Sequence, residues 1–239
     1  QDKEKFSPQE FEGFIKWAAL TYPEFHQATQ LEQLGYSLLF KWEGRDTNLA
    51  PILFEGHHDV VPIIPGSEEL WEEQPFAGVI SNNRIWGRGT LDDKSGVIGL
   101  MEAATHLIKN NYQPKRTVYF AFGHDEEVGG SGAALITEKL RNEGIQLYWS
   151  LGEGSFVNKG FFPGIDKFIA PINVAEKGSA NLLIVATAKG GHSSTPPKKT
   201  AVNILADALI KLENEPLPGS LEGLSAVMFD EVSKHMPFG

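Results

Sequence analysis

The sequence predicts an α/β fold in which a mostly parallel sheet is covered by helices. Short runs of β-branched and aromatic residues alternate with segments of helical periodicity as far as Leu151. The 239 residues are 41% hydrophobic, which is enough for one large core, or for one core and part of another. Because helices connect parallel strands, this alternation favours a sheet with both faces covered.

The elements of this region are expected in a fixed order. A helix spans Phe6 to Leu20, with Ser7 as its N-cap and Pro8 in its first turn. Two apolar runs, 36–42 and 51–54, are separated by a polar loop and look like neighbouring strands. Further along the chain, we expect a helix over 93–110, a strand over 116–122, a helix over 131–142 and a strand over 145–151.

The pattern changes after Phe168. Two longer strand-like stretches, 168–174 and 179–188, precede a loop with Gly190-Gly191 and a helix over 200–212. We therefore expect two domains, 1–176 and 177–239.

Composition excludes several kinds of chemistry. The chain has no cysteine, so a metal would be held by histidines and carboxylates alone. A net charge of −10, without a basic cluster, disfavours nucleic acid as a partner. The longest apolar runs are far shorter than the roughly 20 residues of a membrane helix. We expect a soluble protein that is not bound to membranes; secreted, periplasmic and cytoplasmic locations all stay open.

Polar residues directly follow three of the predicted strands, at the sheet edge where α/β proteins bind ligands. In the first of these segments, His57 and Asp59 are two residues apart and so share one side of an extended chain. A carboxylate placed in this way can orient a metal-binding imidazole. His58 points to the opposite side. An isolated His-x-Asp is more often a surface turn.

The other segments supply carboxylates. Asp92 precedes a helix, where it is either an N-cap or a ligand shared by two metals, and Asp93 could take the other role. Glu126 and Glu127 follow a buried strand, and adjacent carboxylates repel unless a cation or a proton offsets them. One could bind metal while the other takes a proton from the metal-bound water. Solvated loop charges are the simpler alternative.

His192 follows Gly190-Gly191 in the second region. It is either a loop histidine or a donor to a developing oxyanion from another domain or subunit. The remaining histidines are expected to be structural or exposed, namely His26, His106, His124 and His235.

Four motifs in a fixed order resemble the zinc-dependent peptidase family that contains glutamate carboxypeptidase, aminoacylase and the acetylornithine and succinyl-diaminopimelate deacylases. Within this family the chain is most similar to the carboxypeptidase S (Gly-Xaa carboxypeptidase) and N-acyl amino acid hydrolase branch. The motifs are Gly56-His57-His58-Asp59-Val60-Val61-Pro62, Gly87-Arg88-Gly89-Thr90-Leu91-Asp92-Asp93-Lys94, Asp125-Glu126-Glu127-Val128-Gly129-Gly130 and Gly191-His192-Ser193-Ser194.

The resemblance implies a role for each matching residue. His57 binds one zinc, Asp92 bridges two, and Glu127 binds the other. Glu126 is the general base, and Asp59 orients His57. Two zinc ions are the implied cofactors, with cobalt or manganese also acceptable to such ligands.

The resemblance also implies a domain plan. Residues 1–176 are the zinc-binding catalytic domain, and 177–239 begin a smaller α+β lid and dimerisation domain. His192 would stabilise the transition state from this lid, usually across a homodimer.

Two departures from the family pattern matter. The branch has an acidic zinc ligand where this chain has Gly152, so Glu153 would have to replace it. Family members also continue beyond the lid to a late histidine that completes the second metal site. We therefore expect the catalytic domain to lack its C-terminal part here, and metal occupancy to be partial or absent.

The resulting prediction is a metal-dependent hydrolase of the metallo-carboxypeptidase or aminoacylase type. Its substrates would be small peptides or N-acyl amino acids, cleaved at the amide bond by a water that two zinc ions activate. The alternative is a ligand-deficient, non-catalytic member of the same fold that acts as a binding module.

Overall fold

The computed structural model describes residues 6–154, 156–175, 178 and 180–237. The chain divides into two compact units, Gln1–Glu153 and Gly154–Gly239, and each is described by itself. The expected domain boundary after residue 176 stays a prediction.

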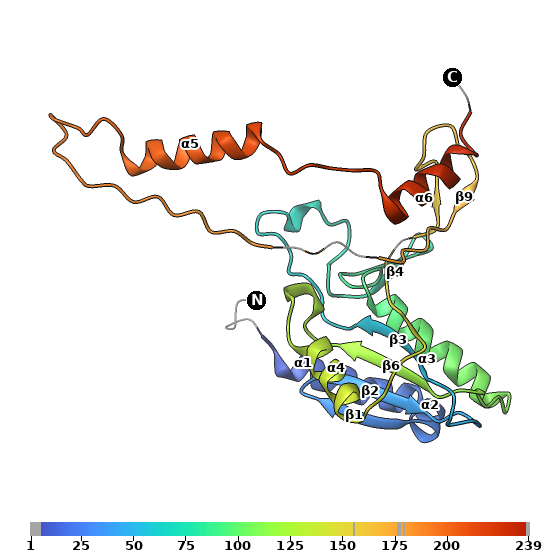
Figure 1. Ribbon diagram of the computed structural model, residues 1–239. Helices are drawn as coiled ribbons and strands as arrows, with labels where there is room; N and C mark the ends of the chain where they lie inside the picture. Colours follow the sequence, from blue (N-terminus) through green and yellow to red (C-terminus); the bar gives the residue numbers. More distant parts are fainter. Residues whose placement is uncertain (1–5, 155, 176–177, 179, 238–239) are drawn as a thin grey trace. The chain divides into compact units, whose positions relative to one another are not determined.

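A five-stranded mixed sheet forms the centre of the first unit (Figure 1). The order is β1-β2-β6-β3-β7; β3 is parallel to β6 and β7, whereas β2 is antiparallel to β1 and β6. The strands are β1 (Gln30–Leu34), β2 (Ser37–Trp42), β3 (Ile52–His57), β6 (Val118–Gly123) and β7 (Trp149–Leu151). The predicted α/β fold is confirmed, with a parallel core and an antiparallel edge.

One detail of the predicted sheet was wrong, because β2 and β3 are not neighbours. Strand β6 lies between them and pairs with both. Its five residues 118–122 are all buried, so β6 needs a partner on each side and a covered surface on each face. This requirement places β6 in the middle of the sheet.

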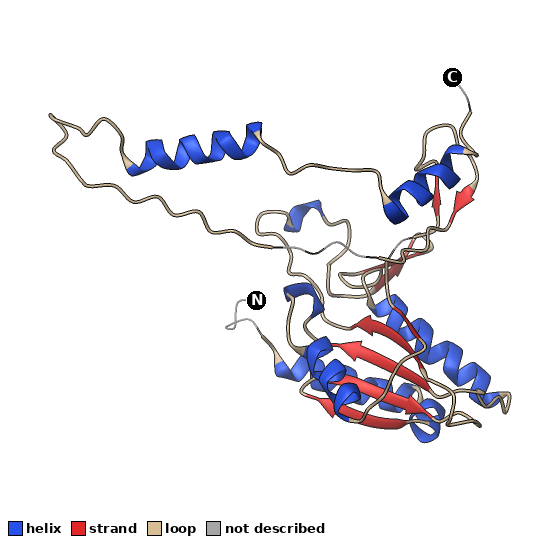
Figure 2. Cartoon of the chain, viewed as in Figure 1, coloured by secondary structure: helices blue, strands red, loops and turns tan. Residues whose placement is uncertain are grey.

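Side chains alternate between two cores on opposite faces of the sheet. Phe40 and Phe120 face helices α1 (Pro8–Thr21), α2 (Pro23–Ala28) and α3 (Lys94–Lys109), whereas Leu39 and Tyr119 face α4 (Gly132–Asn142). Figure 2 shows these helices on the two sides of the strands. Three of them, α1, α3 and α4, confirm the helices expected over 6–20, 93–110 and 131–142.

The segment between β3 and α3 contains elements that the sequence pattern did not reveal. A short 3₁₀ turn at Glu68–Leu70 precedes a hairpin of β4 (Val79–Ser81) and β5 (Arg84–Trp86). Its two-residue connection, Asn82-Asn83, has positive φ at both residues, which asparagine tolerates better than most residues do. This Asn-Asn pair was the available signal for a hairpin.

The described residues of the second unit form a short antiparallel pair and two helices. The elements are β8 (Asn158–Lys159), β9 (Phe168–Ile169), α5 (Ala201–Asn214) and α6 (Gly223–Ser233). Helix α5 confirms the expected helix over 200–212, and Thr200 caps it with Asn203 in a reciprocal capping box. None of the described helices has both the length and the apolar character needed to cross a bilayer.

The strand expected over 179–188 was wrong for residues 180–188, which have no regular structure; residue 179 lies outside the described residues. The strand expected over 168–174 is found only at 168–169. Leu182, Leu183 and Val185 remain exposed. β-Branched residues fit a strand only when a neighbouring strand completes the hydrogen bonds, and among the described residues none pairs with this segment.

Candidate metal centre

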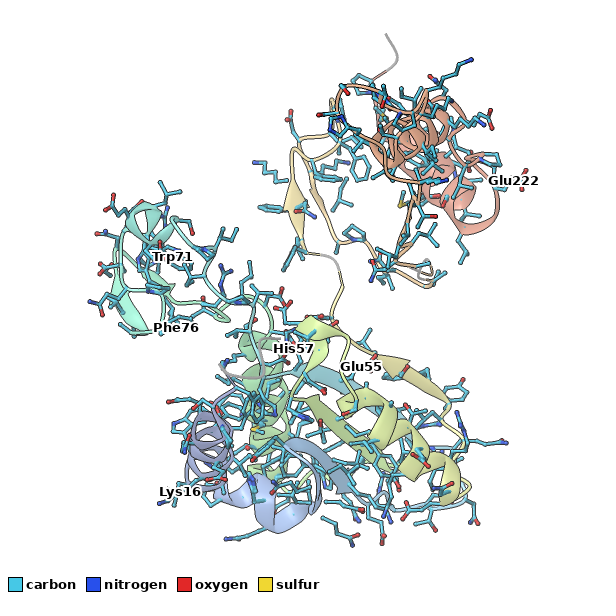
Figure 3. The ribbon with its side chains drawn as sticks, turned by 90° about the vertical axis from the view of Figure 1, so that its left-hand side faces the viewer. Lys16, Glu55, His57, Trp71, Phe76 and Glu222 are labelled. Carbon is cyan, nitrogen blue, oxygen red and sulfur yellow. The ribbon has the colours of Figure 1, made fainter. Side chains whose placement is uncertain are left out.

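Five ionisable side chains meet at the carboxyl ends of β3, β6 and β7. His57 ends β3 and pairs with Gly123 at the end of β6, and the 3₁₀ turn Glu126–Val128 follows. Glu153 lies two residues beyond β7. Figure 3 shows His57 at this end of the sheet, away from Trp71 and Phe76 in the hairpin segment. The sheet topology thus brings together residues that are up to 96 positions apart, from His57 to Glu153.

The carboxylates surround one ring nitrogen of His57. Its Nε2 atom lies 3.0 Å from Asp92 Oδ1, 3.4 Å from Glu153 Oε2 and 3.9 Å from Glu126 Oε2. The side chain of His57 is 2% exposed, whereas those of Asp92, Glu126 and Glu153 are 62%, 54% and 41% exposed. The imidazole is therefore held in the interior, and the carboxylates lie on its solvent-facing side.

Two groups of these side chains have ligand atoms within 4.8 Å of one another. One contains His57, Glu126 and Glu153, and the other contains His57, Asp92 and Glu127. All five residues expected to act as metal ligands or as the base are thus close together.

Asp59 connects the histidine to the glutamates. Its Oδ1 atom lies 3.3 Å from His57 Nδ1, and its two oxygens accept hydrogen bonds from the backbone N–H groups of Glu126 (3.1 Å) and Glu127 (3.2 Å). Burial would raise the pKa of Asp59, but the hydrogen bonds from His57 and these amides hold it below its usual value. The contact with His57 was expected, whereas the two amide contacts were not.

Asp93 lies behind the site as the N-cap residue of α3. Its carboxylate accepts a hydrogen bond from the backbone N–H of His57 at 3.3 Å, and the peptide bond between Asp92 and Asp93 is cis. Burial raises the pKa of Asp93. A side chain at Gly56 would lie 2.6 Å from Asp93 Oδ2, and one at Gly96 would also collide with this carboxylate. Asp93 therefore fills the space between β3 and α3, while Asp92 faces His57.

Gly152 occupies the position where the sequence departs from the family pattern. A side chain added there would lie 2.6 Å from both Cγ and Oε1 of Glu55. The carboxylate of Glu55 thus takes the space beside Gly152, near His57 on the same strand (Figure 3). Glu153, rather than residue 152, supplies the acidic group next to the imidazole. The proximity of Glu55 was missed, although its i, i+2 spacing from His57 was a usable signal.

The site carries more negative charge than its single histidine offsets. Burial alone would lower the pKa of His57, but hydrogen bonds to Asp59 and Asp92 and the charge of Glu153 raise it to about 10. Burial, with the charges of Asp93, Asp92 and Glu126, raises the pKa of Glu153 to about 7 despite His57. Burial also raises the pKa of Glu127. A divalent cation would relieve this repulsion, and histidine with carboxylates suits zinc, cobalt or manganese.

His58 points away from the site, as expected. Its buried ring should make the free energy of unfolding depend on pH. Its ring stacks on Phe14 at 4.9 Å, and its Nε2–H donates to the Tyr36 carbonyl at 3.1 Å. Its buried Nδ1 has no hydrogen-bond partner among the described residues, so protonation would create an unsatisfied N–H. Burial lowers the pKa of His58 from 6.5 to about 4.

Because this pKa is lower in the folded protein, the contribution of neutral His58 is complete above pH 6.5 and is lost as pH falls towards 4. We expect the full effect to be on the order of 3 kcal/mol. Urea unfolding between pH 7 and 4, with a chelator present, would measure it. His58→Gln should have a flatter profile; an unchanged profile would rule out His58 as the cause.

His192 lies in the second unit. It is exposed, and its Nδ1 atom lies 2.7 Å from Ser194 Oγ. Its expected role at the transition state therefore remains a prediction. Among the other histidines, His106 and His235 are exposed, and His26 contacts the Tyr22 carbonyl.

Comparison with known proteins identifies the family. Residues 53–233 match the family described as Peptidase family M20/M25/M40. The chain belongs to this family. The resemblance inferred from the four motifs is thereby confirmed, and metal dependence is a property of the family.

Several relatives are similar over most of this chain. The probable carboxypeptidase S-like 2 of Dictyostelium discoideum is 39% identical over 94% of the chain and 44% of its own length. The human N-fatty-acyl-amino acid synthase/hydrolase PM20D1 is 42% identical over 85% of the chain and 40% of its own length. Among solved structures, the M20 family metallo-carboxypeptidase Sso-CP2 of Sulfolobus solfataricus is 24% identical, with a TM-score of 0.47 over 60% of the chain and 33% of that structure. The chain thus spans less than half the length of these relatives.

Proposed function

We propose that the chain forms the metal-binding part of an amide hydrolase that acts on peptides or N-acyl amino acids. The observation that carries this proposal is the convergence of His57, Asp92, Glu126, Glu127 and Glu153 at one sheet edge. Membership of the M20 peptidase family supports the reaction class. The names of the relatives, carboxypeptidase S-like and N-fatty-acyl-amino acid synthase/hydrolase, support the two substrate classes.

The proposed cofactor is a pair of zinc ions. Because His57 Nδ1 faces Asp59, only Nε2 is free to bind metal, and one ring nitrogen holds one ion. His57 and Glu153 would hold the first ion, Glu127 the second, and Asp92 would be shared by both. When bound, zinc lowers the pKa of a coordinated water and polarises the substrate carbonyl.

In this mechanism, the side chain of Glu126 moves the proton. Its carboxylate is 54% exposed and 3.9 Å from His57 Nε2, so it can contact both solvent and a substrate amide bound beside His57. It accepts a proton from the attacking water as the carbon–oxygen bond forms. It then donates this proton to the leaving nitrogen as the carbon–nitrogen bond breaks. The carboxylate of Asp59 holds the backbone of Glu126 in place by accepting a hydrogen bond from the Glu126 N–H group.

The assembly around this reaction is also proposed from the resemblance. His192 would donate a hydrogen bond to the oxyanion, in a homodimer formed through the lid domain. A non-catalytic binding module is the second candidate, and the absence of an acidic side chain at Gly152 favours it.

Zinc binding gives the first test. At a zinc concentration 100 times the Kd, we expect the free energy of unfolding to rise by about 2.7 kcal/mol and thermal unfolding to shift upward. A chelator should reverse the shift, and His57→Ala should abolish it. If zinc neither binds nor stabilises the chain, the residues of this chain do not form a metal centre by themselves.

Activity distinguishes the two candidates. Amino acid release from dipeptides and N-acyl amino acids should depend on added zinc. Zinc binding without release of amino acid from either substrate class would favour the binding module.

A further inference from the structure

His124 lies close in sequence to Glu126 and Glu127, but its side chain is not part of the candidate metal centre. It lies between the end of β6 and Glu126-Glu127, but its side chain reaches β2, where Nδ1 is 2.7 Å from Ser37 Oγ. The rings of Phe11 and Tyr36 pack against it at 6.1 Å and 5.8 Å. This histidine therefore links the loop that follows β6 to the interior of the first unit.

Asp125 ties the other end of the same loop to α4. Its carboxylate accepts hydrogen bonds from the backbone N–H groups of Ser131 (2.7 Å) and Gly132 (2.8 Å). Within the loop, the Gly130 N–H donates to the Asp125 carbonyl at 2.8 Å. Residues 123–130 are termed here the carboxylate loop. An internal hydrogen bond closes this loop, His124 attaches it to β2, and Asp125 attaches it to the start of α4.

Gly132 shows how closely these groups are packed. An added side chain at this position would lie 2.6 Å from Asp125 Oδ1 and 3.1 Å from His124 Nδ1, and it would collide with the hydroxyl of Ser37. Ser37, His124 and Asp125 thus surround one backbone position at the start of α4. A larger residue there would separate them.

The combination of Ser37, His124 and Asp125 resembles the residue types of a nucleophilic triad, but burial excludes that chemistry. Ser37 is 0% exposed, so its hydroxyl cannot reach a substrate. His124 Nε2 lies 3.7 Å from Asp125 Oδ2, and with the ring proton on Nε2, Nδ1 accepts from the Ser37 hydroxyl. The interaction is a fixed internal hydrogen bond.

We infer that Ser37 and His124 are positioning residues that hold the carboxylate loop so that Glu126 and Glu127 face His57. This inference rests on the proposed function for its chemical meaning. The Glu126 side chain is half exposed, so its position depends on the backbone beneath it. Asp59 fixes that backbone from the His57 side, and the Ser37–His124 bond fixes it from the β2 side. Removing the second attachment should loosen the loop while the sheet remains folded.

Amide hydrogen exchange of Ser37→Ala in the metal-free chain tests the inference directly. We expect the amides of residues 125–130 to exchange about tenfold faster, because local opening of the loop costs less. Thr117→Val is the matched control, since it removes another buried hydroxyl, one that accepts from the Gly44 N–H at 3.2 Å. Unchanged exchange in Ser37→Ala, or equal acceleration in the control, would overturn the inference.

Zinc affinity gives the second readout. It should fall about tenfold or more in Ser37→Ala and in His124→Leu, remain unchanged in Thr117→Val, and recover in His124→Asn, whose amide can replace Nδ1. Equal affinity in Ser37→Ala and the parent chain would count against the inference. If the parent chain binds no zinc, its residues do not hold the metal by themselves, and hydrogen exchange alone decides the positioning role.

Discussion

Glu126→Gln is expected to lower the rate of amide hydrolysis by roughly 10²–10⁴-fold while leaving zinc binding nearly intact. Glutamine keeps the size of the side chain and an acceptor oxygen, but it cannot take a proton from water. The backbone N–H of Glu126 would still donate to Asp59, so the loop should keep its position. The measurements are kcat on a dipeptide or an N-acyl amino acid, and zinc content by metal analysis.

Glu127→Gln is the matched variant for this prediction, because the two residues are adjacent and both donate a backbone N–H to Asp59. It should lose zinc affinity as well as activity. Loss of zinc from Glu126→Gln, with zinc retained in Glu127→Gln, would show that the two roles are exchanged. Glu126 also lies 3.9 Å from His57 Nε2 and belongs to a group that could hold a metal, so the two roles could be exchanged.

Asp59→Ala is expected to have the largest effect on folding. The variant removes a buried carboxylate and leaves the ring of His57 and the amides of Glu126 and Glu127 without that acceptor. Losing one partner of a buried charged network costs on the order of 3–5 kcal/mol. Urea unfolding of the metal-free chain would measure this change.

Zinc binding should also weaken in Asp59→Ala, by about 10–100-fold, because the residue that orients the ligand imidazole is lost. Asp46→Ala is a suitable control: that carboxylate accepts from the Asn48 N–H but is not buried. Its loss should change stability by less than about 0.5 kcal/mol. Equal effects of the two substitutions would mean that Asp59 has no special role.

The sequence predicted the elements with strong periodicity or clear caps. Helix α3 has a continuous apolar face, and Thr200 caps the start of α5, so local pattern and final structure agree. Strand order was harder, because the position of β6 between β2 and β3 depends on long-range pairing. The segment 180–188 shows the opposite error, since its local preference for strand has no neighbour to satisfy it.

Much of the candidate site was also predictable, for a related reason. Strand ends in an α/β sheet share one edge, so His57, Glu126 and Glu153 could be placed together from strand assignments. The supporting contacts could not be predicted in the same way. The bonds from Asp59 to two backbone amides, and from His124 to Ser37, depend on the path of a loop between elements. No residue pattern specifies such a path.

The side chain of Asp93, which fills the space between β3 and α3, limits which residues can occupy the neighbouring positions. Gly56 lies in β3, whereas Asp93 and Gly96 lie at the start of α3, yet all three share a single small volume behind His57. A methyl group at either glycine needs the space that the aspartate already fills, and a shorter residue at 93 would leave the His57 amide without its acceptor. A larger residue at position 56 or 96 would therefore need a different residue at position 93.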